Sequence, residues 1–175
     1  MTACATEEVE PTQPVSAKLG EFIRSVDCAD LTHGHLDTIQ VTVALDNVEH
    51  QITAEIAQET SERAQGLMCR ESIPDGTGMI FLYPGPRSTG FWMFNTYSEI
   101  DALYLDRSRH IIDKITMTPC LREGLSDDDW QIKCATESGD YTPSSEYATV
   151  LELPARWLES IGIDDTNIDQ VSINW

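Results

Sequence analysis

The chain has 175 residues, a length typical of one domain, and 41% of them are hydrophobic, which is enough to build a core. Its 11 Lys and Arg residues stand against 30 Asp and Glu residues, so the formal net charge is −19. Such an acidic surface repels phosphate backbones and anionic lipid headgroups, so we expect no nucleic-acid partner. No run of apolar residues approaches the roughly 18 that a membrane-spanning helix needs.

The first residues, Met-Thr-Ala-Cys, resemble the end of a bacterial lipoprotein signal, in which a small residue precedes the lipidated cysteine. Residues 1–17 are otherwise acidic, contain proline and lack a period, which predicts a flexible tether. The basic and apolar parts of a signal are absent. Two interpretations stay open. In one, a trimmed lipoprotein is exported or anchored to a membrane through a lipid on Cys4; in the other, a cytoplasmic protein carries this cysteine by chance.

Residues 18–37 show no clean period, and we expect an irregular lead-in there. From Thr38 the pattern becomes that of strands. Apolar and polar residues alternate over 38–45 and again over 48–56, and Asp46 and Asn47 separate the two runs. This pattern predicts a β-hairpin.

Residues 58–70 break the alternation and predict a short helix, with Thr60 as its N-cap and Gly66 at its end. A second short helix is expected over 154–162, between Pro154 and Gly162. Between and around these segments the sequence predicts strands over 79–83, 90–96, 100–106, 110–117, 146–153 and 169–175. Short strands separated by turns favour a single β-sandwich or barrel domain over 38–175.

The segment Gly-Phe-Trp-Met-Phe-Asn-Thr, residues 90–96, is unusually apolar for a strand with one exposed face. Alternation would send Phe91 and Met93 into the core, and Trp92 and Phe94 to the opposite face. The second pair then needs a cover. The candidates are the turn over 62–70, the loop between Cys120 and Cys134, or a ligand.

Five cysteines, at positions 4, 28, 69, 120 and 134, show no Cys-x-x-Cys spacing, which weakens zinc and thioredoxin-like interpretations. Cys120 and Cys134 bracket a polar loop that a disulfide would close. In a reducing compartment the same pair would be ordinary thiols.

Four segments, 62–84, 90–106, 117–120 and 147–163, resemble in order and spacing the domain of unknown function 192 family of bacteria and archaea. The resemblance covers roughly residues 38–175 and implies a mainly β fold, a jelly-roll-like antiparallel β-sandwich with one or two short helices. It implies no reaction, because the family has no established one. Members are often exported and often carry a second cysteine after Pro-Cys, which implies a disulfide between Cys120 and Cys134.

This chain departs from the family pattern at two places. Cys69 replaces the usual aromatic residue after Gly-Leu-Met, and the proline common after Asn-Thr is missing from residues 95–101. Both departures leave the shape of the local loops open.

Arginines flank the motif loops of this acidic chain. Arg63, Arg70 and Arg87 precede the apolar segment 90–96, and guanidinium groups beside an aromatic wall suit a carboxylate, sulfate or sugar-acid ligand. In the alternative, each arginine pairs with a nearby acidic residue and holds a loop. We favour the structural alternative.

A second candidate cluster lies where the apolar segment ends. Asn95, Thr96 and Asp101 are the polar rim that would orient a ligand over Trp92. The competing interpretation is that their side chains satisfy backbone N–H groups of the loop.

The sequence gives little support to metal or enzyme chemistry. Methionines in the motif blocks could hold Cu(I), and His33 and His35 could ligate a metal, but core packing and incidental histidines explain them better. There is no Gly-x-Ser-x-Gly motif and no glycine-rich phosphate loop. We therefore assign no catalytic residue, no metal and no cofactor.

These observations favour a non-catalytic, exported or membrane-tethered monomer that binds a small molecule, a glycan or an envelope partner. The expected ligand-binding residues are Arg63, Arg70, Trp92, Asn95, Thr96 and Asp101. The alternative is a hydrolase or lyase that acts on cell-envelope carbohydrate, using Asp101 and a motif arginine.

Overall fold

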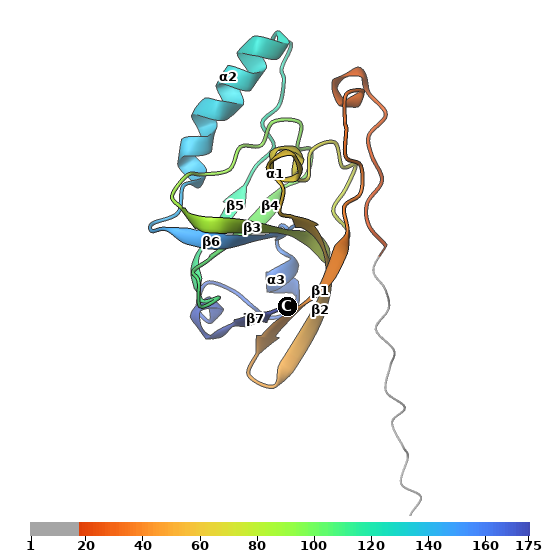
Figure 1. Ribbon diagram of the computed structural model, residues 1–175. Helices are drawn as coiled ribbons and strands as arrows, with labels where there is room; N and C mark the ends of the chain where they lie inside the picture. Colours follow the sequence, from red (N-terminus) through yellow and green to blue (C-terminus); the bar gives the residue numbers. More distant parts are fainter. Residues whose placement is uncertain (1–17) are drawn as a thin grey trace, which may run out of the picture.

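The structure is a computed structural model, and it describes residues 18–175. The predicted tether and Cys4 lie outside these residues. Seven strands form one curled sheet in the order β5-β4-β6-β3-β2-β1-β7 (Figure 1). The strands are β1 Thr38–Leu45, β2 Val48–Ala57, β3 Thr77–Arg87, β4 Ile100–Leu105, β5 Ile111–Met117, β6 Tyr147–Pro154 and β7 Ser172–Asn174.

Three short α-helices and three 3₁₀ turns complete the fold. The helices are α1 Thr60–Gln65, α2 Asp127–Glu137 and α3 Trp157–Ser160, and the 3₁₀ turns are η1 Val26–Cys28, η2 Ser138–Tyr141 and η3 Ile168–Gln170. α1 and α2 lie on one side of the sheet, and α3 lies on the other (Figure 1). The expected class, a mainly β sandwich-like or barrel-like fold with few short helices, is confirmed.

The sheet is mixed because one pair of neighbouring strands is parallel. β1 and β2 form the predicted antiparallel hairpin, whereas β2 and β3 run parallel, with Ala57 opposite Phe81. Two parallel neighbours need a crossover connection. Here α1 and the loop over residues 66–76 form this connection. The predicted short helix is therefore part of the crossover that lets β3 run parallel to β2.

Each face of the sheet carries its own hydrophobic core. One core contains Leu103, Leu151 and Leu158, and the other contains Phe81, Met93 and Tyr104. β6 lies between β3 and β4, and seven of its eight residues are buried. Because both faces of this strand are covered, alternation of apolar and polar residues is lost there.

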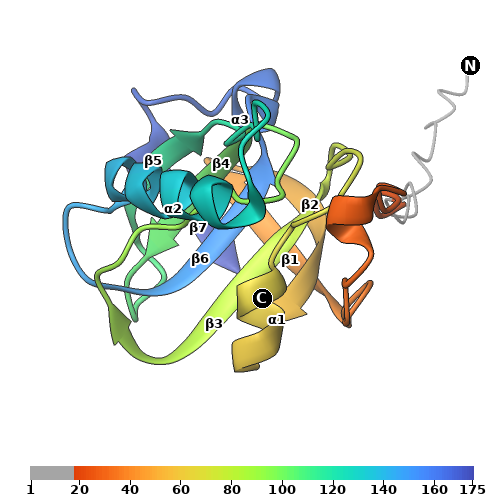
Figure 2. The ribbon, with the colours of Figure 1, turned by 90° about the horizontal axis from the view of Figure 1, so that it is seen from above.

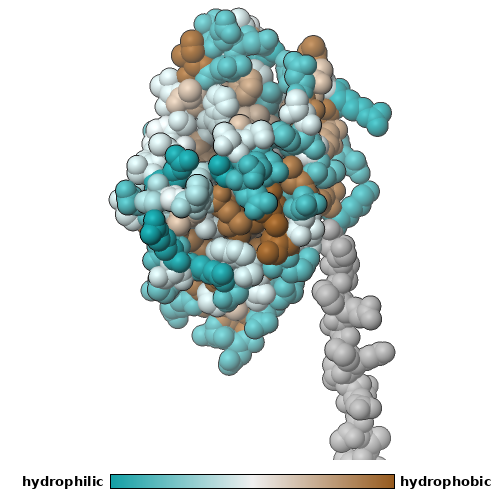
Figure 3. All heavy atoms as spheres, in the orientation of Figure 1, coloured by the Kyte–Doolittle hydropathy of each residue, from teal (hydrophilic) through white to brown (hydrophobic). Residues whose placement is uncertain are grey.

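Hydrophilic residues cover much of the face seen in Figure 3, and hydrophobic residues gather in a patch near its centre. Within residues 18–175, no helix combines the length and the apolar character that crossing a bilayer requires.

Two helix termini differ from the prediction. The N-cap of α1 is Glu59 rather than Thr60, because the side chains of Glu59 and Glu62 satisfy each other's backbone N–H groups in a capping box. Pro154 ends β6 and does not begin a helix. α3 starts only at Trp157, after Arg156 in a left-handed conformation with φ of 64°.

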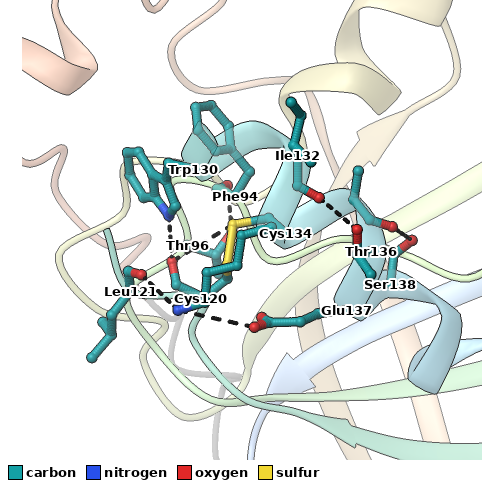
Figure 4. The surroundings of a disulfide bond; sticks show 12 residues. Phe94, Thr96, Cys120, Leu121, Trp130, Ile132, Cys134, Thr136, Glu137 and Ser138 are labelled. Atoms are coloured by element: carbon teal, nitrogen blue, oxygen red, sulfur yellow. Dashed lines mark hydrogen bonds and ion pairs between the residues drawn. A yellow bond between two sulfur atoms is a disulfide. The ribbon is translucent and has the colours of Figure 1, made fainter. Parts of the chain in front are cut away.

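The polar segment 118–145 is largely helical. Ser126 caps α2 by accepting a hydrogen bond from the backbone N–H of Asp129, and Trp130 and Cys134 turn towards the sheet. Cys134 is linked to Cys120, and the indole N–H of Trp130 donates to the Cys120 carbonyl at 2.8 Å (Figure 4). Viewed from above, α2 lies across the sheet (Figure 2).

A second disulfide, Cys28–Cys69, was not anticipated from the sequence. It joins the lead-in to the loop after α1. Phe22 also forms an isolated antiparallel bridge with Arg70, so the disulfide and this bridge both fasten the lead-in to the domain. The regular structure of the lead-in is limited to η1 and the bridge at Phe22.

Candidate functional site: a groove at Trp92 and a buried glutamate

Residues 90–96 are not a strand, contrary to the prediction. Along the chain they connect β3 to β4, and they pair with neither strand. A turn at Phe94 and Asn95 ends the extended part. The side chains still alternate. Phe91 packs edge-on against Phe81, with ring centroids 4.9 Å apart, and Met93 is buried, so the predicted division of faces is right although the strand is not.

The opposite face of this segment is only partly covered. Phe94 packs against Trp130 of α2, with 4.5 Å between ring centroids. Trp92 stacks on Phe94 at 5.2 Å, but 38% of its surface stays exposed. The segment 118–145 therefore covers Phe94 and leaves one face of Trp92 accessible.

Trp92 forms part of a groove of about 320 Å³. Its walls come from α1, β3, the segment after β3, and the α2–η2 region. The lining residues are Arg63, Tyr83, Thr89, Gly90, Phe91, Trp92, Ala135, Ser138 and Tyr147. We call this the Trp92 groove. Four of its residues are aromatic, which is the composition of sites that bind the apolar faces of small molecules.

Arg63 supplies the positive charge of the Trp92 groove. Its guanidinium group donates to the carbonyls of Gln58 and Leu82, the second at 3.1 Å, and so holds α1 against β3. Arg63 and Arg87 both lie near the ring of Tyr83, at 5.2 and 5.3 Å from its centroid. Arg63 is thus a structural residue that also borders the groove.

Glu152 lies beneath this groove, and the sequence did not identify it as a site residue. Its side chain points from β6 into the core that contains Phe81 and Met93, and only 3% of Glu152 is exposed. It lines a cavity of about 20 Å³, whose other walls include Arg63, Phe91 and Trp92. Those three residues also line the Trp92 groove, so the cavity and the groove adjoin.

The Glu152 carboxyl group is enclosed by the protein. No residue among 18–175 donates a hydrogen bond to it. Burial raises the pKa of Glu152 to about 8, because an ionised carboxylate loses its hydration there. At neutral pH the group is therefore mostly protonated and can both donate and accept hydrogen bonds.

Three buried tyrosines surround Glu152. The Tyr104 hydroxyl donates to the Tyr141 carbonyl at 2.7 Å, and that of Tyr147 donates to the Thr89 carbonyl at 2.8 Å. Burial raises the pKa of Tyr83, Tyr104 and Tyr147 above the usual tyrosine range. All three remain neutral over the range in which Glu152 titrates.

Arg70 is not available to a ligand. Its Nη2 atom donates to both carboxylate oxygens of Glu55, at 2.6 and 2.7 Å, and the two side chains are 3% and 2% exposed. Burial lowers the pKa of Arg70, which the charge of Glu55 partly offsets. The structural alternative therefore describes this arginine, although its partner is distant in sequence.

Asp101 is fully buried, and both of its oxygens have partners. One accepts from the Thr116 hydroxyl at 2.6 Å, and the other accepts from the backbone N–H of Arg156 at 2.8 Å. Asp101 thus holds the turn after β6 against β4. It has no access to a substrate, and the hydrolase or lyase alternative finds no support at this residue.

Asn95 and Thr96 also have structural partners. Asn95 adopts a left-handed conformation with φ of 52°, and its amide donates to the Asp27 carbonyl at 3.1 Å. The Thr96 hydroxyl donates to the Phe94 carbonyl at 3.3 Å, and Thr96 lines the Glu152 cavity. Of the six expected ligand-binding residues, only Arg63 and Trp92 border the Trp92 groove.

The candidate metal ligands do not converge. His35 contacts Arg70, and the backbone N–H of His33 donates to the side chain of Gln65. In the part of the chain that the structure describes, no three His, Cys, Asp or Glu side chains are grouped as a metal site requires.

The comparisons with known proteins agree with this fold. The family model DUF192, described as "Uncharacterized ACR", matches residues 41–169. The chain therefore belongs to the domain of unknown function 192 family. None of the curated proteins is similar to it.

Two crystal structures share the fold. One is a "putative transcription regulator" from Sinorhizobium meliloti, with a TM-score of 0.63 and 23% identity over 82% of this chain and 97% of that one. The other is a protein of unknown function from Novosphingobium aromaticivorans, with a TM-score of 0.61 and 24% identity over 87% and 99% of the two chains. At these identities the likeness concerns the fold alone.

Proposed function

We propose that this protein is a non-catalytic, exported or membrane-tethered domain that binds a small molecule or a glycan in the Trp92 groove. The observation that carries the proposal is the incomplete cover of an aromatic segment. Met93 is buried and Phe91 and Phe94 are partly buried, whereas Trp92 keeps 38% of its surface exposed at a groove that it shares with Tyr83, Phe91 and Tyr147. Exposed aromatic rings beside a few polar groups are typical of ligand sites.

Two further features agree with this function. Two disulfides, Cys28–Cys69 and Cys120–Cys134, suit an oxidising compartment outside the cytoplasm. The net charge of −19 disfavours a nucleic-acid partner. The groove would present Arg63 as a positive group on an acidic molecule.

A ligand screen with a matched pair of variants tests the proposal. Thermal unfolding is measured with D-glucose, N-acetyl-D-glucosamine, D-glucuronate and divalent metal ions, and binding is then followed by saturation-transfer NMR. Trp92→Ala should abolish binding of a sugar, whereas Tyr97→Ala should not. Tyr97 is also 38% exposed but lies outside the Trp92 groove. If no sugar binds, or if both variants bind equally well, the proposal is wrong.

A further inference from the structure

We propose that Glu152 is the specificity-determining residue of the Trp92 groove. Its carboxyl group would form a hydrogen bond with one hydroxyl group of a sugar or polyol whose ring stacks on Trp92. This inference rests on the proposed function and extends it by naming the ligand class and the protein group that recognises the ligand. It assigns a role to a side chain that the fold alone does not need.

The geometry shows a buried carboxyl group at the wall of a small cavity that adjoins the groove. Glu152 is 97% buried, no described residue hydrogen-bonds its carboxyl group, and it lines a cavity that shares Arg63, Phe91 and Trp92 with the groove. Buried polar groups in proteins nearly always have partners. Glu55, on the same face of the sheet, meets that rule through Arg70. Glu152 meets it only if something enters the cavity.

The size of the cavity limits what can enter. A volume of about 20 Å³ admits one water-sized group and excludes a carboxylate, a phosphate or a sugar ring. The groove itself, at about 320 Å³, accommodates the ring. A hydroxyl group attached to a ring in the groove therefore fits both spaces, and it would displace a single water.

Charge favours a hydroxyl over an amine. Arg63 borders both the groove and the cavity, so a cationic ligand meets a positive group at either place. An ammonium group would also have to be buried against an ionised carboxylate, which costs more desolvation than a neutral pair. A protonated carboxyl group, by contrast, donates one hydrogen bond to a hydroxyl and accepts another.

The titratable groups around Glu152 are few. They are Arg63 from α1, Tyr83 from β3, Tyr104 from β4 and Tyr147 from β6, and the tyrosines stay neutral because burial raises the pKa of each. Segment 90–96, which covers the cavity, contributes no titratable side chain. Since the pKa of Glu152 is about 8, affinity for a hydroxyl group should decrease above that pH, when a charge forms in the apolar cavity.

The test measures saturation-transfer binding of D-glucose, N-acetyl-D-glucosamine and D-glucuronate to the full chain between pH 6 and 9.5. The wild type should bind at least one probe and lose roughly ten-fold in affinity above pH 8. Glu152→Gln keeps the shape and the hydrogen-bonding capacity, so it should bind within about two-fold of wild type at pH 7 and lose the pH dependence. Glu152→Leu should lose roughly ten-fold at pH 7. Glu146→Gln, an exposed position just before β6, is the matched control and should behave as wild type.

The outcomes separate the two proposals. If no probe binds, or if Trp92→Ala has no effect, the proposed groove function fails and this inference fails with it. If a probe binds in a Trp92-dependent manner but Glu152→Leu binds equally well, only the role of Glu152 is refuted. An affinity that rises with pH and is lost in Glu152→Gln would also refute it, because the ionised carboxylate would then be the binding form.

Discussion

Arg70 and Glu55 form a buried ion pair between the loop after α1 and β2, with Nη2 of Arg70 within 2.7 Å of both carboxylate oxygens. Glu55 also accepts a hydrogen bond from the backbone N–H of Leu36 at 2.6 Å. The pair therefore ties the lead-in, the crossover connection and the sheet to one carboxylate. Because the crossover also carries Arg63, one of the residues lining the Trp92 groove, we expect the pair to support the site without contacting a ligand.

Removing one member of this pair should be strongly destabilising. Glu55→Gln leaves the charge of Arg70 buried without compensation, and we expect a loss of about 3 kcal/mol or more in the free energy of unfolding. Urea denaturation measures it. Glu99→Gln is the control, since Glu99 pairs with Arg156 at the surface, where such pairs contribute less than about 1 kcal/mol. Equal effects of the two substitutions would contradict the buried pair.

Glu152 should make stability depend on pH. Its pKa is raised from 4.5 to about 8 in the folded state, so between these values the folded protein binds a proton that the unfolded chain has released. The stabilisation is complete below pH 4.5 and is lost as pH rises to about 8, by up to roughly 5 kcal/mol. The unfolding free energy of wild type minus that of Glu152→Gln should therefore decrease across this window. The difference cancels the contributions of the other acidic residues, and a flat difference would show that Glu152 titrates normally.

Gly90 should tolerate no side chain. A Cβ atom there would collide with the carbonyl of Ser138 and lie 2.9 Å from the Thr142 hydroxyl, because the segment before Trp92 passes directly beside η2. We expect Gly90→Ala to cost about 1–3 kcal/mol in unfolding free energy and to weaken sugar binding. Gly85→Ala, where nothing lies within 4 Å of the added atom, should be nearly neutral. Similar losses for both would mean that η2 moves aside freely.

The two disulfides should form under oxidising conditions, and each should stabilise the domain. Alkylation of the unfolded, unreduced protein should modify Cys4 alone, and mass spectrometry should find Cys28 linked to Cys69 and Cys120 linked to Cys134. In the chain-entropy model, loops of these lengths correspond to about 4 and about 3 kcal/mol. Free thiols at Cys120 and Cys134 would contradict the second linkage. An equal loss of stability on removing either bond would contradict the dependence on loop length.

The sequence predicted local structure well where one face of an element is exposed. Alternation located β1 and β2 and their turn because one face of this hairpin carries polar residues, although Thr53 and Glu55 of that face are buried. It failed for residues 90–96, which have the side-chain pattern of a strand but no strand neighbours. Phe91 and Met93 contact the sheet from above it, so their alternation reflects an extended backbone and not a ladder of hydrogen bonds.

The candidate site was only half predictable. Trp92 and Arg63 were identifiable, because an aromatic residue in an over-apolar segment and an arginine in an acidic chain both stand out. Glu152 was missed because it follows Val150 and Leu151 in a strand that is covered on both faces, where a glutamate looks like an ordinary outward residue. One signal was present in the sequence. Leu151 and Leu153 flank Glu152 directly, and of the residues two positions away Val150 is apolar and the other is Pro154.

By itself, the sequence determined the mainly β class, the first hairpin, the family and the two faces of residues 90–96, because these follow from the local period of side chains and from motif spacing. Only the tertiary structure decided that Arg70 meets Glu55, that Cys28 meets Cys69, and that Glu152 lies under Trp92 without a partner. Contacts of this kind depend on which strands become neighbours. The parallel crossover between β2 and β3 sets that order, and no local pattern in the chain encodes it.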